Sequence, residues 1–475
     1  MKNFSLALAL ALVSISGTTM AQKSKKETIK AIDARQEGYA AIAKQIWGYA
    51  EVGFQETRSS ALLQETLAKA GFKVEKGVAG MPTAFIASYG QGKPIIAILG
   101  EFDALPGLAQ EAVPVKKPIE GQGAGHACGH HLFGTASAAA AIAAKDWLTA
   151  NKRQGTIRFY GTPAEEGGSG KVYMVREGLF QDVDAVINWH PGAGNSASPG
   201  TSLANKTGKF RFYGVAAHAA AAPFRGRSAL DAVEAMDAMV NMMREHVTPE
   251  TRIHYVITRG GEAPNVVPAF AEVYYYVRHP SRDEVKDVWE RIVNAAKGAA
   301  LGTDTKVEVE ITGGVHDLLP NETLARAMYA NLKEVGGYAM TDEEKAFGAE
   351  VQKTFTGKVP PLSSTQDIAE YQLRAGTAST DVGDVSWVVP TVGMSAATWV
   401  PGTAAHSWQA VAAGGTSIGI KGMMMAAKSM ALTAIDLYTN PALLEGAWKE
   451  FKGKTEGFTY EALIGDRPPA LDYRK

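Results

Sequence analysis

The chain has 475 residues, of which 46% are hydrophobic and 20% charged, so it is long enough for two or more domains and has an ordinary globular composition. Its 48 basic and 49 acidic residues give a formal net charge of -1. This balance gives no electrostatic case for a nucleic acid or an anionic membrane surface as a partner.

The first 21 residues have the pattern of a secretory signal peptide. Lys2 supplies a positive start, residues 6–15 form a short apolar run, and small residues before Gln22 suit cleavage after Ala21. A membrane anchor is the alternative, but the run is shorter than the roughly 20 residues that a spanning helix needs. By composition, we expect no later stretch to span a bilayer. The sequence therefore predicts an exported, periplasmic protein that has no membrane attachment once the signal is removed.

Between the signal and residue 205, predicted helices alternate with short, continuously apolar strands. Strands of this kind are covered on both faces, and their alternation with helices indicates an α/β layer with a largely parallel mixed sheet. The predicted helices span residues 27–52, 59–70, 137–150 and 172–180, and the predicted strands span 94–99, 156–160 and 185–189. The pattern resumes later in the chain, with helices at 321–335 and 416–438, a strand at 385–389 and a long loop at 355–380.

The middle of the chain has a different order of elements. Strands are predicted at 210–215, 252–258, 271–278 and 306–311, with helices at 228–246 and 283–300. Two helices and four strands in this order suggest a compact α+β domain of ferredoxin-like type, inserted between two parts of the first domain. We therefore divide the chain into the signal, a first α/β part, the inserted domain, a second α/β part and a C-terminal tail, at 1–21, 22–205, 206–316, 317–450 and 451–475.

The strongest chemical signal is the run GHACGHH at residues 125–131, directly before the alanine-rich helix. Cysteine thiolates and imidazoles are the usual zinc ligands. A spacing of two residues would place Cys128 and His130 on one side of an extended segment, and the following helix N-terminus would favour the thiolate. Cys128 is the only cysteine, so it cannot form an internal disulfide. A buried cysteine beside histidines that line a loop remains the alternative.

A pair of carboxylates, Glu165 and Glu166, follows the predicted strand at 156–160. Metal-assisted hydrolysis needs one carboxylate to hold the metal and another to accept a proton from the attacking water. Adjacent side chains in an extended chain point in opposite directions, so one could face the metal and the other the water. A solvated acidic turn is the alternative interpretation of this pair taken alone.

Three more residues become candidates through their positions. A lone histidine such as His190 or His406 is more often structural than a ligand, but most candidates lie near predicted strand ends or helix starts, where α/β folds place their sites. Asp103, after the strand at 94–99, could orient a ligand histidine through a hydrogen bond. Its alternative is a polar turn that ends the strand.

Together, these motifs resemble those of the dinuclear metallopeptidases and amidohydrolases, a family that includes carboxypeptidase G, aminoacylase and the indole-acetyl-amino-acid hydrolases. The resemblance covers nearly the whole chain after the signal. Several long stretches in matching order are more specific than any single motif. The stretches that carry it are residues 85–94, 100–108, 125–131, 165–180, 379–387 and 404–409.

The resemblance implies a metal site with two divalent cations. Cysteine favours zinc, although manganese or cobalt could serve. Glu165 would be the general base and later the proton donor, and Asp103 would orient a ligand. His131 stands where relatives usually carry Asn or Asp, and it could be an extra ligand. The implied ligands are Cys128 as a bridging thiolate, His130, Glu166, His190 and His406.

The resemblance also assigns roles to the inserted domain, as a lid and dimerisation domain. His218 would reach the partner subunit's site and stabilise the oxyanion. Asn265 and Arg278 would contact substrate, with Arg278 gripping a carboxylate. Ordinary strand and loop structure is the alternative for all three residues.

The predicted function is hydrolysis of the amide bond of an N-acyl or N-aroyl amino acid of the p-aminobenzoyl-glutamate type. A dipeptidase or carboxypeptidase of the same family is one alternative. A catalytically silent exported binding protein is another, although the intact Glu165–Glu166 pair argues against it. We expect a small-molecule substrate and a homodimer, or an assembly with a related subunit.

Overall fold

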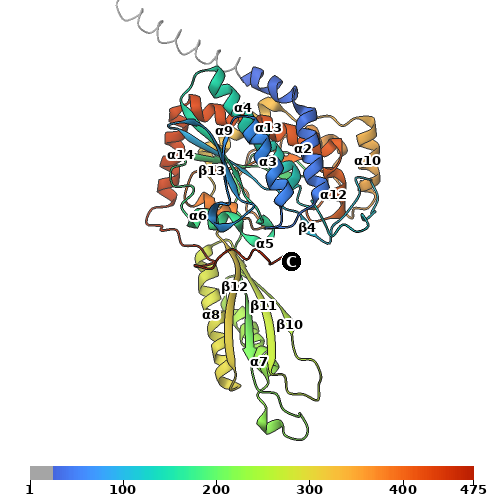
Figure 1. Cartoon of the computed structure of the whole chain (residues 1–475), viewed down its shortest axis with the longest axis vertical. Helices are drawn as coiled ribbons and strands as arrows, with labels where there is room; N and C mark the ends of the chain where they lie inside the picture. Colours follow the sequence, from blue (N-terminus) through green and yellow to red (C-terminus); the bar gives the residue numbers. More distant parts are fainter. Residues whose placement is uncertain (1–24) are drawn as a thin grey trace, which may run out of the picture.

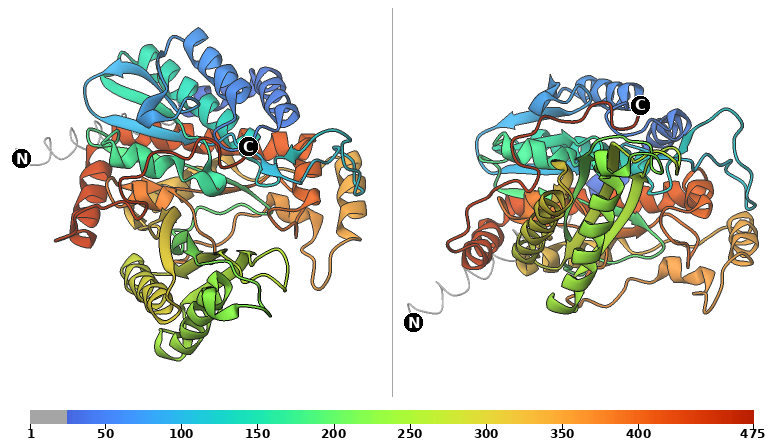
Figure 2. Two further views of the ribbon diagram at one scale, coloured as in Figure 1. Left: turned by 60° about the horizontal axis from the view of Figure 1, so that its bottom comes forward. Right: turned by 90° about the horizontal axis from the view of Figure 1, so that it is seen from below.

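The computed structural model describes residues 25–475. The predicted signal peptide at residues 1–21 lies outside this range. The described chain has an α/β body and a narrower projection, coloured from green to yellow, that stands out from it (Figures 1 and 2).

A six-stranded sheet forms the centre of the α/β body, in the order β1-β2-β6-β3-β7-β13. β3 pairs in parallel with β6 and β7, and β7 pairs in parallel with β13, whereas β1 and β2 are antiparallel additions at one edge. The prediction of an α/β fold with a largely parallel mixed sheet is therefore confirmed. The strands are β1 (Lys73–Lys76), β2 (Phe85–Gln91), β3 (Ile95–Gly100), β6 (Gly155–Gly161), β7 (Ala185–Ile187) and β13 (Thr391–Val392).

Helices cover both faces of this sheet, which explains the continuous apolar sequence of β3. All six of its residues are buried. Ile96 and Ile98 join the hydrophobic cluster of α2 (Gln36–Tyr49), α3 (Thr57–Lys69), α4 (His130–Ala150) and α13 (Ser417–Thr439). Ala97 and Leu99 join the cluster of α6 (Gly170–Arg176) and α11 (Val382–Ser386). Alternate residues of one strand thus supply two cores.

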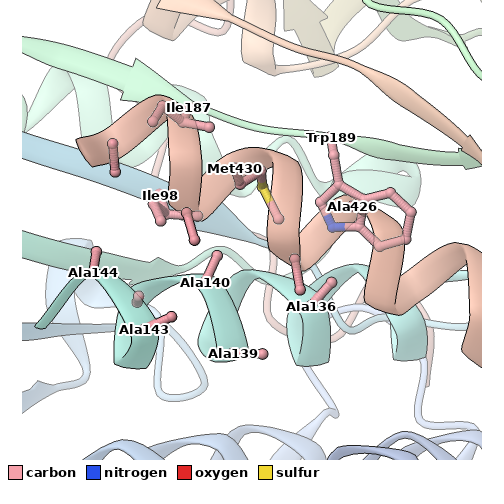
Figure 3. Packing of buried hydrophobic residues seen from close by; sticks show 14 of the residues in the cluster. Ile98, Ala136, Ala139, Ala140, Ala143, Ala144, Ile187, Trp189, Ala426 and Met430 are labelled. Carbon is pink, nitrogen blue, oxygen red and sulfur yellow. The ribbon is translucent and has the colours of Figure 1, made fainter. Parts of the chain in front are cut away.

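The alanine-rich helix α4 packs directly against α13, the longest apolar helix of the second α/β part. Figure 3 shows Ala136, Ala140 and Met430 gathered where the two helices meet. α13 is long and apolar enough to cross a membrane, contrary to the sequence-based expectation, and it is the one such helix among residues 25–475. However, 89% of its most apolar stretch is buried inside the fold, so α13 serves as a core helix here.

The projection contains a four-stranded antiparallel sheet in the order β10-β11-β9-β12. Two helices, α7 and α8, pack on the sheet and share a separate hydrophobic core with it. The chain order of these elements is β-α-β-β-α-β, as the sequence indicated, whereas the bounds 206–316 and the lid role remain predictions. The elements are β9 (Ala204–Tyr213), α7 (Ala229–Met243), β10 (Arg252–Arg259), β11 (Phe270–His279), α8 (Arg282–Gly302) and β12 (Lys306–Val315).

Four further helices belong to the second α/β part and contact α13. They are α9 (Glu322–Val335), α10 (Asp342–Gln352), α12 (Trp408–Gly414) and α14 (Pro441–Lys454). The predicted strand at 385–389 is wrong, because helix α11 occupies its start and a turn follows. Val382, Val385 and Val389 are buried at spacings of three and four residues, the period of a helix face rather than of a strand.

Candidate metal centre

The candidate residues meet at the carboxyl edge of the parallel strands. Glu101 and Asp103 follow β3, and Glu165 and Glu166 follow β6. His190 begins the short strand β8 (His190–Gly192) just beyond β7. Carboxyl ends of parallel strands share one edge of a sheet, and α/β folds place their sites there.

Two clusters of donor atoms share one thiol. Cys128, His130 and His190 each offer one donor atom, and these atoms lie within 4.8 Å of one another. The donor atoms of Cys128, Glu166 and His406 satisfy the same limit. The Sγ atom of Cys128 lies 3.4 Å from His190 Nε2, and Glu166 Oε1 lies 3.1 Å from His406 Nε2. The five predicted ligands therefore converge, with Cys128 in the bridging position.

The backbone around Cys128 differs from the expected extended segment. Gly129 has a φ of +78°, and His130 is the first residue of α4, so the histidine points from the first helical turn. The backbone N–H of His406 donates to the carbonyl of Ala127 at 3.0 Å, which brings His406 beside the thiol. Burial raises the pKa of the Cys128 thiol. A bound cation would reverse this shift, because a coordinated thiol loses its proton.

Asp103 orients two of the candidate ligands, as the sequence indicated it could. Its Oδ1 atom lies 2.8 Å from His130 Nδ1, which leaves His130 Nε2 available for a metal. Its Oδ2 atom accepts a hydrogen bond of 2.9 Å from the backbone N–H of Glu166. Hydrogen bonds of this kind fix the ring orientation of ligand histidines.

Two buried polar atoms beside the thiol support the fit of a cation. Glu101 Oε2 and His130 Nε2 lie 3.1 Å apart, and neither has a hydrogen-bond partner among the described residues. Buried polar atoms without a partner are rare in folded proteins. Since carboxylate oxygen and imidazole nitrogen are both metal donors, a divalent cation would satisfy both atoms.

Glu165 lies beside these clusters and lines the cavity in front of them. Burial and the nearby charges of Glu101 and Glu166 raise the pKa of its carboxyl group well above the usual value. Glu165 also lies near Glu101 and His130 in a third group of potential donors. The expected extended backbone is wrong here too, because Glu165 and Glu166 lie in a short turn, α5 (Glu165–Gly168), whose left-handed Gly167 redirects the chain.

Sequence reasoning missed a buried charge network next to the clusters. The Nζ atom of Lys171 lies 2.6 Å from Glu101 Oε1 and 2.6 Å from Asp381 Oδ1, and all three side chains are buried. Burial opposes the charge of Lys171, but the two carboxylates outweigh it and raise the pKa of the amine. A lysine within the apolar run of α6 was the available signal, whereas its partner Asp381 stands 210 residues away.

His131, the candidate extra ligand, faces away from the clusters. Its Nε2 atom lies 3.0 Å from the carbonyl oxygen of Gly414, and its ring packs 4.9 Å from that of His126. Burial lowers the pKa of His131 well below the usual value. His131 belongs to none of the donor clusters found in residues 25–475, so the structure does not bring it to the metal site.

A cavity of about 720 Å³ opens in front of the donors. Arg278 lies on its wall, with the guanidinium carbon 4.4 Å from the centroid of the Tyr276 ring. Residues 376–380, the end of the predicted long loop, form another wall together with Asp381 and Val382 at the start of α11. The cavity is therefore lined by four of the five predicted ligands, by Glu165 and by the positive charge of Arg278.

His218 and Asn265 do not reach this cavity in the same chain. Both lie in loops at the end of the projection that β9 reaches at Tyr213. β9 starts at the α/β body and has ten residues, so it carries this end roughly 30 Å away. The structure thus brings together every predicted site residue except His131, His218 and Asn265.

The comparisons with known proteins agree on one family. The model of Peptidase family M20/M25/M40 matches residues 97–368. The chain is 44% identical over 461 residues to one of the subunits of the p-aminobenzoyl-glutamate hydrolase of Escherichia coli K12, covering 91% of this chain and 96% of that protein. It is 30% identical over 452 residues to mouse Xaa-Arg dipeptidase, covering 91% and 93%.

Solved structures share the fold at lower sequence identity. An aminobenzoyl-glutamate utilization protein from Klebsiella pneumoniae has a TM-score of 0.61 at 18% identity, covering 86% of this chain and 97% of that chain. A dinuclear metal binding peptidase from Bacillus subtilis has a TM-score of 0.59 at 16% identity, covering 86% and 99%. The resemblance inferred from the sequence motifs is confirmed: the chain belongs to Peptidase family M20/M25/M40 and is a metal-dependent hydrolase of amide C–N bonds.

Proposed function

We propose that this chain is an exported amidohydrolase that cleaves N-acyl or N-aroyl amino acids of the p-aminobenzoyl-glutamate type. The observation that carries the proposal is the pair of donor clusters that share Cys128 beside the carboxylate of Glu165. The 44% identity to a component of a p-aminobenzoyl-glutamate hydrolase supports the substrate class.

The donor set suits two zinc ions, because thiolate, imidazole and carboxylate are the ligands that zinc prefers, while manganese or cobalt could replace it. Two bound divalent cations would lower the pKa of a water molecule and polarise the amide carbonyl. Glu165 accepts the proton of the attacking water and passes it to the leaving amine nitrogen.

Arg278 is the residue that we assign to the free carboxylate of the substrate. Its guanidinium can bind a carboxylate through two parallel hydrogen bonds. The ring of Tyr276 stacks against it and limits the directions that the guanidinium can face. Arg278 and Glu165 line the same cavity, so a substrate bound through this carboxylate would have its amide bond in the space that Glu165 faces.

A second copy of the chain would complete the site. The Nδ1 atom of His218 accepts hydrogen bonds of 3.2 Å from the backbone N–H groups of Ala220 and Ala221, which orients the ring and assigns the proton of a neutral imidazole to Nε2. Edge strand β10 exposes Val256 and Ile257, apolar side chains suited to pairing with another copy. In such a homodimer His218 would serve the partner's cavity and stabilise the oxyanion. Asn265, beside it, would contact the same substrate.

Two alternatives concern the substrate and the partner subunit, and experiments can test both. The 30% identity to Xaa-Arg dipeptidase supports a dipeptidase of the same family. A related subunit could also replace the second copy, because the relative from Escherichia coli is itself one subunit of its hydrolase. A silent binding protein would have no need for Glu165 beside the donors.

The test is a substrate screen with the purified metal-loaded chain 22–475. We expect p-aminobenzoyl-glutamate to release free glutamate faster than Xaa-Arg dipeptides release arginine. Faster dipeptide cleavage would replace the substrate assignment, and metal-loaded protein that releases no amine from any compound would favour a binding protein. N-terminal sequencing of chain recovered from a periplasmic fraction should begin at Gln22 if the export proposal is correct.

A further inference from the structure

The C-terminal tail crosses from the projection to the metal-ligand turn. After α14 ends at Lys454, the chain runs, in dark red, between the α/β body and the projection and ends near α5 (Figure 1). Figure 2 shows the same end of the chain lying on the α/β body. Residues 455–475, all within the described part of the chain, do not line the catalytic cavity, so a role of the tail must come through the residues that it contacts.

The first part of the tail is anchored at the base of the projection. Leu463 is buried and belongs to the hydrophobic core of the projection. The guanidinium of Arg467 donates to the carbonyl of Thr312 in β12. Lys286 of α8 forms an ion pair of 3.0 Å with Glu461. These contacts fix the tail before it reaches the site.

The last residues of the tail hold one peptide group of the site. The hydroxyl of Tyr473 donates to the backbone carbonyl of Glu166 at 2.9 Å, and Arg474 Nη2 donates to the same carbonyl at 2.8 Å. The Tyr473 ring meets Phe54 edge to face at 5.7 Å between centroids. Gln55 donates to the carbonyl of Leu471 at 2.8 Å and fixes the tail nearby.

The turn that receives these contacts has an unusual backbone. Ala164, Gly167 and Ser169 all have left-handed φ values, of +56°, +90° and +57°. Torsions of this kind in residues other than glycine persist only where the surrounding structure holds them. Glu56 Oε1 accepts from the backbone N–H of Ala164 at 2.8 Å and restrains the turn at its start.

Glu166 is therefore held from both sides along the backbone. Asp103 accepts from its N–H at 2.9 Å, and the tail donates twice to its carbonyl. With the peptide groups before and after it held, the Cα–Cβ bond from which the Glu166 carboxylate reaches the donor cluster has a fixed position. Without the tail, the Glu166 carbonyl would lose both of these donors, and Asp103 would restrain the residue from one side.

We propose that Tyr473 and Arg474 are positioning residues that hold the Glu166 carboxylate in place for one of the two metal ions. The proposal rests on the proposed role of Glu166 as a metal ligand and extends it to the tail. Within residues 25–475, Tyr473 and Arg474 contact one predicted ligand, Glu166, which belongs to the cluster with Cys128 and His406. Loss of the tail contacts should thus weaken the binding of one metal ion. The affinity for the ion held by His130 and His190 should stay unchanged.

The experiment is a Zn²⁺ titration of the apo chain 22–475 against a chromophoric chelator. In the double variant Tyr473→Phe/Arg474→Ala, which keeps the ring against Phe54, we expect one zinc ion to bind as in the parent. The other should bind about 10- to 100-fold more weakly, the usual effect of losing partners that support a metal ligand. Tyr473→Phe alone keeps one donor and should show a smaller loss, and Arg474→Lys should restore part of the affinity.

Lys475→Ala is the matched control, because Lys475 is exposed at the neighbouring position. A tail that merely supports the fold would lower the melting temperature and leave both zinc affinities unchanged or weaken them equally, and either result overturns the proposal. If the parent chain binds two zinc ions and the double variant has the same two affinities, only the positioning role is ruled out. A parent chain that binds fewer than two removes the proposed two-metal function, and the positioning role with it.

Discussion

The carboxyl edge of the six-stranded sheet and the far end of the projection both carry predicted site residues, but the two sets differ in burial and in their contacts. At the sheet edge, Cys128 and His130 are buried and contact other donors or supporting carboxylates. At the end of the projection, His218 and Asn265 lie in surface loops and contact neither the cavity nor the donors. One chain therefore brings the five predicted ligands together, whereas His218 and Asn265, the residues predicted to contact the oxyanion and the substrate, lie far from the donors of the same chain.

This difference separates two requirements of the reaction. Buried donors and their hydrogen bonds pre-organise metal binding within one chain. If His218 and Asn265 have the roles that we propose, another chain must receive them, so turnover should depend on assembly while metal binding should not. Variants of each region can test the two requirements separately.

The largest effect should come from the sheet edge. Glu165→Gln removes the proton acceptor while keeping the size of the side chain, so we expect turnover to fall by about 10³-fold or more. The measurement is release of glutamate from p-aminobenzoyl-glutamate at saturating substrate. Wild-type turnover in this variant would show that another group accepts the proton.

At the projection, His218→Ala should lower turnover by about 10²- to 10³-fold, the usual cost of losing one oxyanion donor. Mixing this variant with Glu165→Gln provides the sharper result. A hybrid dimer contains one cavity with an intact Glu165 that receives an intact His218, so the mixture should recover activity that neither parent shows. Absence of recovery, with hybrid dimers present, would place His218 outside the partner's site.

Arg278 should affect substrate binding more than the chemical step. Arg278→Ala removes a bidentate contact to a carboxylate, and we expect KM to rise by about 10- to 100-fold with a smaller change in kcat. Arg278→Lys keeps the charge, so its KM should lie between that of the wild-type chain and that of Arg278→Ala. An unchanged KM in both variants would mean that another residue binds the substrate carboxylate.

The smallest effect should come from the exposed edge strand. Val256→Asp places a charge on β10 where a second copy would pair, and we expect the dimer dissociation constant to rise on the order of tenfold. Analytical ultracentrifugation measures this constant, with Leu301→Asp on the exposed end of α8 as the control. Equal behaviour of the two variants would place the dimer interface elsewhere.

The sequence was most informative where strand ends bring residues together. Glu166 and His190 could be assigned to one site because both follow parallel strands, whose carboxyl ends share an edge. Local backbone was less predictable: Glu165 and Glu166 lie in a turn, not an extended segment, because Asp103 and the tail hold its peptide groups. Partners such as Lys171 and Asp381, 210 residues apart, carry no local pattern that links them.

The central claim is that two divalent cations share the thiol of Cys128 beside a carboxylate that is free to move a proton. Elemental analysis of the purified, dialysed chain tests it most directly. We expect two divalent cations per chain in the parent and in Glu165→Gln, and one or fewer in Cys128→Ser. A parent without bound metal, or a Cys128→Ser variant that keeps both ions, would contradict it.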